Sequence, residues 1–219
     1  MTSIRHKSLA ASAEDAVIPT TADDGYLDAA RSAILAVGWS RTTLTDIARR
    51  AGVSRMTLYR RWPDTQTLLA DLMTREWGRV VGEAADSTGP TTTGPTTTGP
   101  LHRVTEGVIA TVRGLRANEL LRRIIDVDPE LLLPYLLDRR GRSQDLLATA
   151  IAALIRDGQV TGAIRSGDAE LLARSLLLAC HGFALSAHTM TEGPSPSRDA
   201  DVTELDAELA HLVERFLQP

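Results

Sequence analysis

Residues 43–63, TLTDIARRAGVSRMTLYRRWP, constrain the fold of this chain more tightly than any other stretch. Thr43 is suited to cap a helix because its hydroxyl can accept from a free backbone N–H, and Asp46 stands three residues on, as in a capping box. Apolar residues then recur at the spacing of one helix face: Leu44, Ile47 and Ala48. Gly52 follows, where a left-handed residue ends a helix and glycine does so without strain. The pattern predicts a short helix that ends near residue 51.

A second short helix follows within a few residues. Ser54 is a good N-cap for it, and residues 55–62 supply about two turns. Pro63 closes the unit because proline disfavours a helical conformation at the residue before it. Two short helices joined by a tight glycine turn form a helix-turn-helix. In such a unit the second helix lies in the major groove of DNA and its first turn meets base edges.

The charge of this segment agrees with that interpretation. Residues 39–62 contain six arginines and one acid, a net +5 within a chain of formal net charge −4. A basic cluster on an acidic protein is typical of a phosphate-binding surface. The alternative is a solvated helical hairpin with ordinary surface arginines. The charged residues concerned are Arg41, Arg49, Arg50, Arg55, Arg60, Arg61 and Asp46.

The string T-x-x-x-IA-x-x-AGVS-x-x-TLY-x-x-WP resembles the DNA-binding segment of the tetracycline-repressor (TetR) family. The match is close from Thr43 to Pro63 and extends loosely to Asp23 and Leu72, whereas the rest of the chain fits that family in length and helical character. The resemblance implies an all-α fold. An N-terminal three-helix helix-turn-helix domain would bind DNA, and a C-terminal helical domain would bind a ligand and dimerise.

A dimer of such modules would read a near-palindromic operator in double-stranded DNA. Arg55 can bind a guanine through O6 and N7, and Met56 or Thr57 can pack on a thymine methyl group. Thr45 matches a family position that often reaches the groove. Two departures from the family are Met56, where glycine or proline is common, and Thr65, where many relatives have a phosphate-binding lysine. The residues expected to contact phosphate are Thr43, Ser54, Tyr59, Arg60 and Arg61.

The bulk sequence bounds the remainder of the fold. The chain has 219 residues, 43% of them hydrophobic and only 4% aromatic, which favours helices packed by aliphatic side chains. Without a long apolar run or an export signal, we expect no membrane span and a cytoplasmic protein. Cys180 is the only cysteine and cannot form an intrachain disulfide. We expect no cofactor and no metal site, because His181 and His188 share a helix face without a convincing further ligand.

We expect a disordered tail over 1–21, a helix-turn-helix domain over 22–63 and a helical ligand-binding and dimerisation domain over 64–219. The first helix should begin at Asp23 or Asp24, with Trp39, Leu58 and Trp62 in the core of the first domain. A flexible insertion, 87–100, contains the repeat TGPTTTGPTTTGP, because glycine and proline at this density prevent a regular helix. Further helices are predicted at about 64–85, 101–117, 119–126, 129–138, 142–158, 168–190 and 201–217.

The last two predicted helices carry many apolar residues, more than one helix face needs. The resemblance implies that they pair with the same helices of a second chain as a four-helix bundle, and two-fold homodimers are the commonest oligomer. The alternative is that both helices are satisfied within one protomer. The predicted dimer contacts are Leu172, Leu176, Leu205, Leu209, Leu212 and Phe216.

The resemblance also implies a cavity in the second domain where a small-molecule effector binds and shifts the two recognition helices. Its expected wall residues are Trp77, Tyr135, His181, Phe183 and His188. The resulting hypothesis is a dimeric, effector-released transcriptional repressor. The alternative is a constitutive DNA-binding protein whose second domain only dimerises. An enzyme is disfavoured because the nucleophile, phosphate-loop, zinc and dinucleotide motifs are absent from the sequence.

Overall fold

The computed structural model describes residues 22–88, 99–191 and 202–219, and these ranges are helical without a strand. The predicted all-α fold is therefore confirmed. The predicted tail, 1–21, and most of the predicted insertion lie outside the described residues. No helix of the described ranges is long and apolar enough to cross a membrane.

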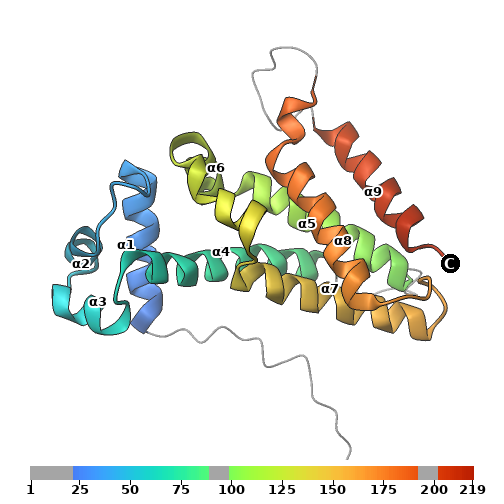
Figure 1. The fold of residues 1–219 in the computed structure, drawn as a ribbon, viewed down its shortest axis with the longest axis horizontal. Coiled ribbons are helices and arrows are strands. Elements are labelled where there is room, and N and C mark those ends of the chain that lie inside the picture. Colours follow the sequence, from blue (N-terminus) through green and yellow to red (C-terminus); the bar gives the residue numbers. More distant parts are fainter. Residues whose placement is uncertain (1–21, 89–98, 192–201) are drawn as a thin grey trace, which may run out of the picture.

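Three short helices form one end of the molecule (Figure 1): α1, Ala22–Val37; α2, Leu44–Ala51; and α3, Arg55–Arg61. The predicted caps are confirmed. The hydroxyl of Thr43 accepts from the N–H of Asp46, and that of Ser54 accepts from the N–H of Thr57. Gly52 is left-handed, with φ of 68°, and its N–H bonds the last carbonyls of α2. Local side-chain chemistry thus sets both ends of the turn between α2 and α3.

The core of this end is aliphatic around two tryptophans. Leu58 and Trp62 are buried, as is Trp39, so their predicted core positions are confirmed. The indole N–H of Trp62 donates to Asp71 at 2.8 Å, and the ring of Tyr26 meets it edge-on. A buried indole N–H needs such a partner, so Trp62 also fixes the start of the next helix.

Helix α4, Thr65–Thr88, runs from this end into a body of longer helices (Figure 1). The body contains α5, Pro100–Ala117; α7, Arg142–Val160; α8, Ala169–Leu185; and α9, Thr203–Leu217. Its core is formed by aliphatic side chains of α5, α7, α8 and α9. Asp206 of α9 is buried and accepts from Arg113 and Arg116 of α5 at 2.8 and 2.6 Å, which pins α9 to α5.

Three predicted boundaries were wrong. The predicted insertion, 87–100, is too long at both ends, since α4 extends to Thr88 and α5 begins at Pro100. Proline is suited to this first helical position because its missing N–H would have no partner within the helix there. The segment 129–138 is two short turns, Pro129–Leu131 and Pro134–Asp138, rather than one helix, since Pro134 cannot donate to the preceding turn. Helix α8 ends at Leu185, and a separate 3₁₀ turn follows at Ala187–Thr189.

Helix α6, Glu119–Val127, packs against the N-terminal helices. Leu120 and Ile124 are buried in the same core as Trp39 and Trp62. At the start of α6, Glu119 accepts from Arg31 of α1 at 3.1 Å. The helix-turn-helix end is therefore joined to the body by both α4 and α6.

Candidate nucleic-acid interface

Helix α3 and its cap Ser54 contain seven of the nine predicted DNA-binding residues. Leu58 is buried on one side of this helix, so residues about half a turn away face solvent. Met56 is 75% exposed at the centre of that outer face. A shallow hollow of about 440 Å³ lies here, lined by Ser54, Met56, Thr57, Tyr59 and Arg60. The structure thus places polar, apolar and cationic groups together on a helix of two turns, as base and phosphate contacts require.

Arg55 lies beside this hollow and is held by Tyr59. Its guanidinium donates to the Tyr59 hydroxyl at 3.2 Å, and it lies over the Tyr59 ring at 4.9 Å from the centroid. The side chain of Arg55, which is predicted to bind a guanine, therefore points along the helix toward Tyr59. A neutral hydroxyl and a ring leave its charge intact, so Arg55 still adds to the positive potential of the surface.

The other arginines divide into paired and unpaired side chains. Arg61, predicted to contact phosphate, donates to Asp23 of α1 at 2.8 Å, and this hydrogen bond raises the pKa of Arg61. Arg49 pairs with Asp46 at 3.0 Å. Within the described ranges, Arg41 and Arg60 form no ion pair and are exposed. Arg50 is exposed too, and its guanidinium donates only to the Ser32 hydroxyl, at 3.4 Å, among the described residues. Arg41, Arg50, Arg55 and Arg60 are therefore the cations of this cluster without an ion pair in the described ranges.

The start of α2 adds hydroxyl groups to the same end of the molecule. The Thr43 hydroxyl donates to the carboxylate of Asp46 at 2.6 Å, and this hydrogen bond is the largest cause of the lowered Asp46 pKa. Thr45, two positions after Thr43, is exposed, as its predicted groove contact requires. Thr43 is also exposed, but its hydroxyl proton is donated to Asp46, so the hydroxyl can donate to a phosphate only after that hydrogen bond opens.

The side chain of Asp128 has a role that the sequence analysis missed: the sequence indicates a helix cap before Pro129, but the side chain makes no cap hydrogen bond there. It follows α6 and accepts from the N–H of Trp39 at 2.7 Å, the N–H of Ser40 at 3.3 Å and the Ser40 hydroxyl. Burial alone would raise the pKa of Asp128, but these hydrogen bonds and the charge of Arg123 lower it below its usual value. Its partners are almost ninety positions away in the chain, so no local pattern could have indicated them.

Residues 27–72 match the bacterial regulatory proteins of the tetR family. An uncharacterized HTH-type transcriptional regulator of Mycobacterium tuberculosis strain H37Rv is 33% identical over 198 residues, covering 90% of this chain and 95% of the relative. The chain belongs to the TetR family of transcriptional regulators. Its α2 and α3 are accordingly the helix-turn-helix of a DNA-binding protein, and the alternative of an ordinary solvated hairpin is set aside.

Solved structures of bacterial transcriptional regulators share the fold over most of the chain. The R. erythropolis repressor QsdR has a TM-score of 0.62 at 19% identity, covering 90% of this chain and 96% of its own. FadR from Bacillus subtilis, solved in complex with stearoyl-CoA, has a TM-score of 0.57 at 14% identity, covering 87% and 96%. At these identities the likeness concerns the fold.

The residues predicted to line an effector cavity have different surroundings in this TetR-family regulator. The side-chain amide of Gln144 bridges the Tyr135 carbonyl at 3.2 Å and the His181 ring at 3.1 Å. His181 is partly buried, which lowers its pKa. Phe183 packs against the body core, whereas His188 is exposed. Trp77 is partly buried on α4.

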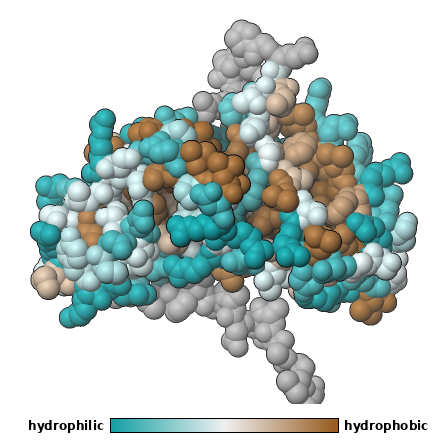
Figure 2. All heavy atoms as spheres, in the orientation of Figure 1, coloured by the Kyte–Doolittle hydropathy of each residue, from teal (hydrophilic) through white to brown (hydrophobic). Residues whose placement is uncertain are grey.

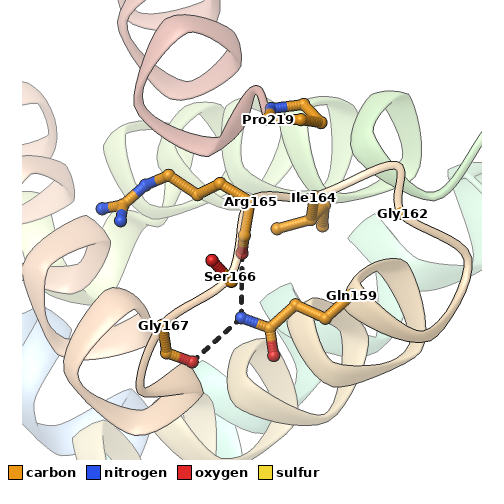
Figure 3. Close-up of a pocket in the computed structure, with 7 residues that line it drawn as sticks. All are labelled: Gln159, Gly162, Ile164, Arg165, Ser166, Gly167 and Pro219. Carbon is orange, nitrogen blue, oxygen red and sulfur yellow. Dashed lines mark hydrogen bonds between the residues drawn. The ribbon is translucent and has the colours of Figure 1, made fainter.

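A larger hollow lies elsewhere, between the α7–α8 connection and the end of the chain (Figure 3). Its volume is about 590 Å³. Gln159 lines this hollow, and its side-chain amide donates to the carbonyls of Arg165 and Gly167. None of the predicted cavity residues lines it; its walls are Gln159, Gly162, Ile164, Arg165, Ser166, Gly167 and Pro219.

The predicted dimer contacts have three different environments. Leu172, Leu176 and Leu209 are buried in the core of their own protomer. Leu205 and Phe216 are partly buried, and Leu212 is 55% exposed. Leu171 and Leu178 of α8, which were not predicted as contacts, are exposed instead. Figure 2 shows apolar side chains gathered over this part of the molecule, whereas the α2–α3 end is mainly hydrophilic.

Cys180 is buried in α8, and burial raises the pKa of its thiol to about 12. Such a thiol is almost wholly protonated at neutral pH and therefore unreactive. Among the described residues no group of three or more histidine, cysteine or acidic side chains is arranged to hold a metal ion.

Proposed function

We propose that this TetR-family regulator binds a near-palindromic operator as a homodimer and acts as a repressor that a small-molecule effector releases. The observation that carries the DNA-binding part is the exposed face of α3. There Met56, Thr57 and Arg60 lie around one hollow, on a helix whose cap and buried residues hold it firmly. As a protein that acts on DNA, it is proposed to work in the cytoplasm.

Each side chain of this face has a proposed partner on DNA. Met56 and Thr57 stand in the first turn, where apolar contact with a thymine methyl group is geometrically natural. Arg55 reads a guanine once it turns from Tyr59, because its two free N–H groups match O6 and N7. Tyr59, Arg60, Ser54 and Thr43 contact phosphates, which fix the position of the helix without specifying sequence. Thr45 approaches the groove from α2.

The homodimer is proposed to form through the outer faces of α8 and α9. Leu171 and Leu178 stand two turns apart on α8, and both are more than half exposed. Leu212 of α9 is exposed as well. Because Leu172, Leu176 and Leu209 already fill the core of one protomer, the partner would meet these outer leucines, with Leu205 and Phe216 at the margin. A two-fold axis here repeats the same contacts in both directions.

The effector is proposed to be a small molecule with a substantial apolar part. FadR from Bacillus subtilis was solved with stearoyl-CoA, and the body core of this chain is built almost entirely from aliphatic side chains. A mainly apolar cavity with a few polar groups is the usual small-molecule site. Gln144 and His181, which are hydrogen-bonded and partly buried, are the polar groups proposed to meet such a ligand.

The first experiment measures DNA binding by fluorescence anisotropy at several salt concentrations, with the duplex upstream of the protein's own gene and a scrambled duplex. Preference for one sequence with a steep salt dependence is expected. Selection from a random pool would define the operator if the upstream DNA is not preferred. No binding to any duplex at low salt would overturn the proposal.

A second measurement separates the two candidate functions. A panel of fatty acids and acyl-CoA thioesters is tested for a shift in melting temperature and for release of the operator. Ligands that raise the melting temperature and weaken DNA binding are expected, because both effects follow from one coupling free energy. Operator binding that no apolar ligand alters would favour the constitutive, dimerising alternative.

A further inference from the structure

The end of α6 and the turn between α1 and α2 meet at one buried carboxylate. Asp128 is 4% exposed and accepts from two backbone amides and one hydroxyl, contributed by Trp39 and Ser40. Both of its oxygens are used, because Oδ2 meets the Trp39 amide and Oδ1 meets both groups of Ser40. Hydrogen bonds to an ionised acceptor are the stronger kind, so this contact holds the turn in one position.

The shape of the turn matches this carboxylate closely. Gly38 has φ of 88°, a conformation that side chains rarely adopt. A Cβ atom at this position would lie 3.0 Å from Asp128 Oδ2 and 3.0 Å from a methyl group of Val127. Glycine is therefore needed both for the backbone conformation and for the approach of α6. The Thr42 hydroxyl donates to the Gly38 carbonyl at 2.7 Å. This hydrogen bond links the turn to the residues just before α2.

The position of the Asp128 contact allows it to influence the orientation of α2 and α3. Helix α4 joins the helix-turn-helix end to the body through the chain itself, and its Glu76 pairs with Arg31 of α1. Helix α6 is attached to α1 as well, through the buried side chains of Leu120 and Ile124 and through the pair of Glu119 with Arg31. The contact of Asp128 lies at the far end of α1, beyond Arg31, and adds a charged, directional attachment there. Two separated attachments fix the orientation of α2 and α3 relative to the body.

We propose that Asp128 is a positioning residue for DNA recognition, which sets the angle of the helix-turn-helix relative to the dimerising body through the Gly38–Ser40 turn. The inference rests on the proposed dimeric function. In a two-fold dimer that angle determines the separation of the two α3 helices, which must match half-sites about one helical turn apart. Asp128 itself contacts no DNA and acts only through this turn.

The test compares the operator with the same duplex carrying one extra base pair at its centre, which moves the half-sites by about 3.4 Å. Anisotropy gives the Kd for each duplex and for an isolated half-site. The variants are Asp128→Asn, which keeps the shape but loses the charge, and Ser40→Ala, which removes one of the three donors. Glu130→Gln is the matched control, because Glu130 lies two positions further on and is exposed, and its carboxylate takes part in none of the contacts with Trp39 and Ser40.

Wild type and Glu130→Gln should bind the natural spacing much better than the lengthened one. In Asp128→Asn the ratio of the two Kd values should fall on the order of tenfold, with a smaller fall in Ser40→Ala, while half-site binding is unchanged. Hydrogen exchange should show faster exchange at the amides of residues 39 and 40.

Two results would overturn the inference. One is an unchanged spacing ratio in Asp128→Asn. The other is a parallel loss of half-site and full-site binding that follows the fraction of unfolded protein by circular dichroism, which would mean a structural role alone. Failure of wild type to discriminate any duplex would instead overturn the proposed function, so the two failures are distinguishable.

Discussion

Arg55 and Arg60 lie on the same short helix, but their side chains have different surroundings. Arg55 is held against Tyr59, near the end of α3 that is proposed to enter the groove. Arg60 lines the hollow with no ion pair among the described residues. An arginine that reads a base and one that meets a phosphate are expected to behave differently on mutation.

Replacement of these two arginines by alanine should therefore give different results. Arg55→Ala should relax preference at one operator base pair and cost about 1–3 kcal/mol on the preferred sequence only. Arg60→Ala should weaken binding to all duplexes alike and reduce the salt slope by about 1. Anisotropy against a set of single-base operator variants measures both. Arg103→Ala is the control, because Arg103 is exposed on α5, away from α3 and from the proposed dimer surface; equal effects of Arg55→Ala and Arg60→Ala would contradict the assignment.

The lowered pKa of Asp128 leads to a second prediction, which concerns the stability of the protein in acid. Because its pKa is lowered in the folded protein, the charged form stabilises the fold at pH values above the unfolded pKa of about 3.9. That contribution is lost as the pH falls through the folded pKa. Asp128→Asn should thus be less stable than wild type at pH 7, and the difference should shrink below about pH 4. Urea unfolding at pH 7 and pH 3.5 measures it; a constant difference would contradict it.

At the scale of elements, the helix-turn-helix could be predicted because its determinants are local. The two short helices begin or end through hydrogen bonds between near neighbours in the chain, at Thr43, Gly52 and Ser54. The sequence alone is therefore enough to predict where these helices begin and end. The position of α6 could not be predicted in this way. Leu120 and Ile124 show a helical stripe, but only the packed molecule reveals that the stripe faces the N-terminal helices. The same holds for the candidate site, where the α3 face was predictable and Asp128 was not.

Two left-handed glycines make a matched pair for testing the turns. Gly52 has φ of 68°, and a Cβ added there would have nothing within 4 Å, whereas a Cβ on Gly38 would also meet Asp128 and Val127. Gly52→Ala should cost only the left-handed strain, about 1–2 kcal/mol. Gly38→Ala should cost more, because α6 must shift as well. Chemical unfolding of both variants tests this; equal losses would mean that the Asp128 contact adapts without cost.

At the scale of the whole molecule, the two hydrophobic cores divide the chain differently from its sequence order. The N-terminal core includes α6, and the body core includes α5, α7, α8 and α9. A change at the body surface can therefore reach α3 through α4 and α6, without passing along the chain. The outer leucines of α8 and α9 belong to neither core, which makes them available for the proposed contact between protomers.

This division predicts opposite results for two neighbouring leucines of α8. Leu178 is 72% exposed, so Leu178→Glu should leave the protomer folded but separate the dimer, and operator affinity should fall with it because two linked half-sites bind far more tightly than one. Leu177 is buried, so Leu177→Glu should unfold the protein by placing a charge in the core.

Analytical ultracentrifugation and circular dichroism separate these outcomes. Leu137→Glu is the control for Leu178→Glu, because Leu137 is equally exposed but lies on the α6–α7 connection. It should remain dimeric and bind the operator as wild type does. If Leu178→Glu is also dimeric at micromolar concentration, the protomers must meet through another surface, since a buried pair of carboxylates across a two-fold axis could not persist there.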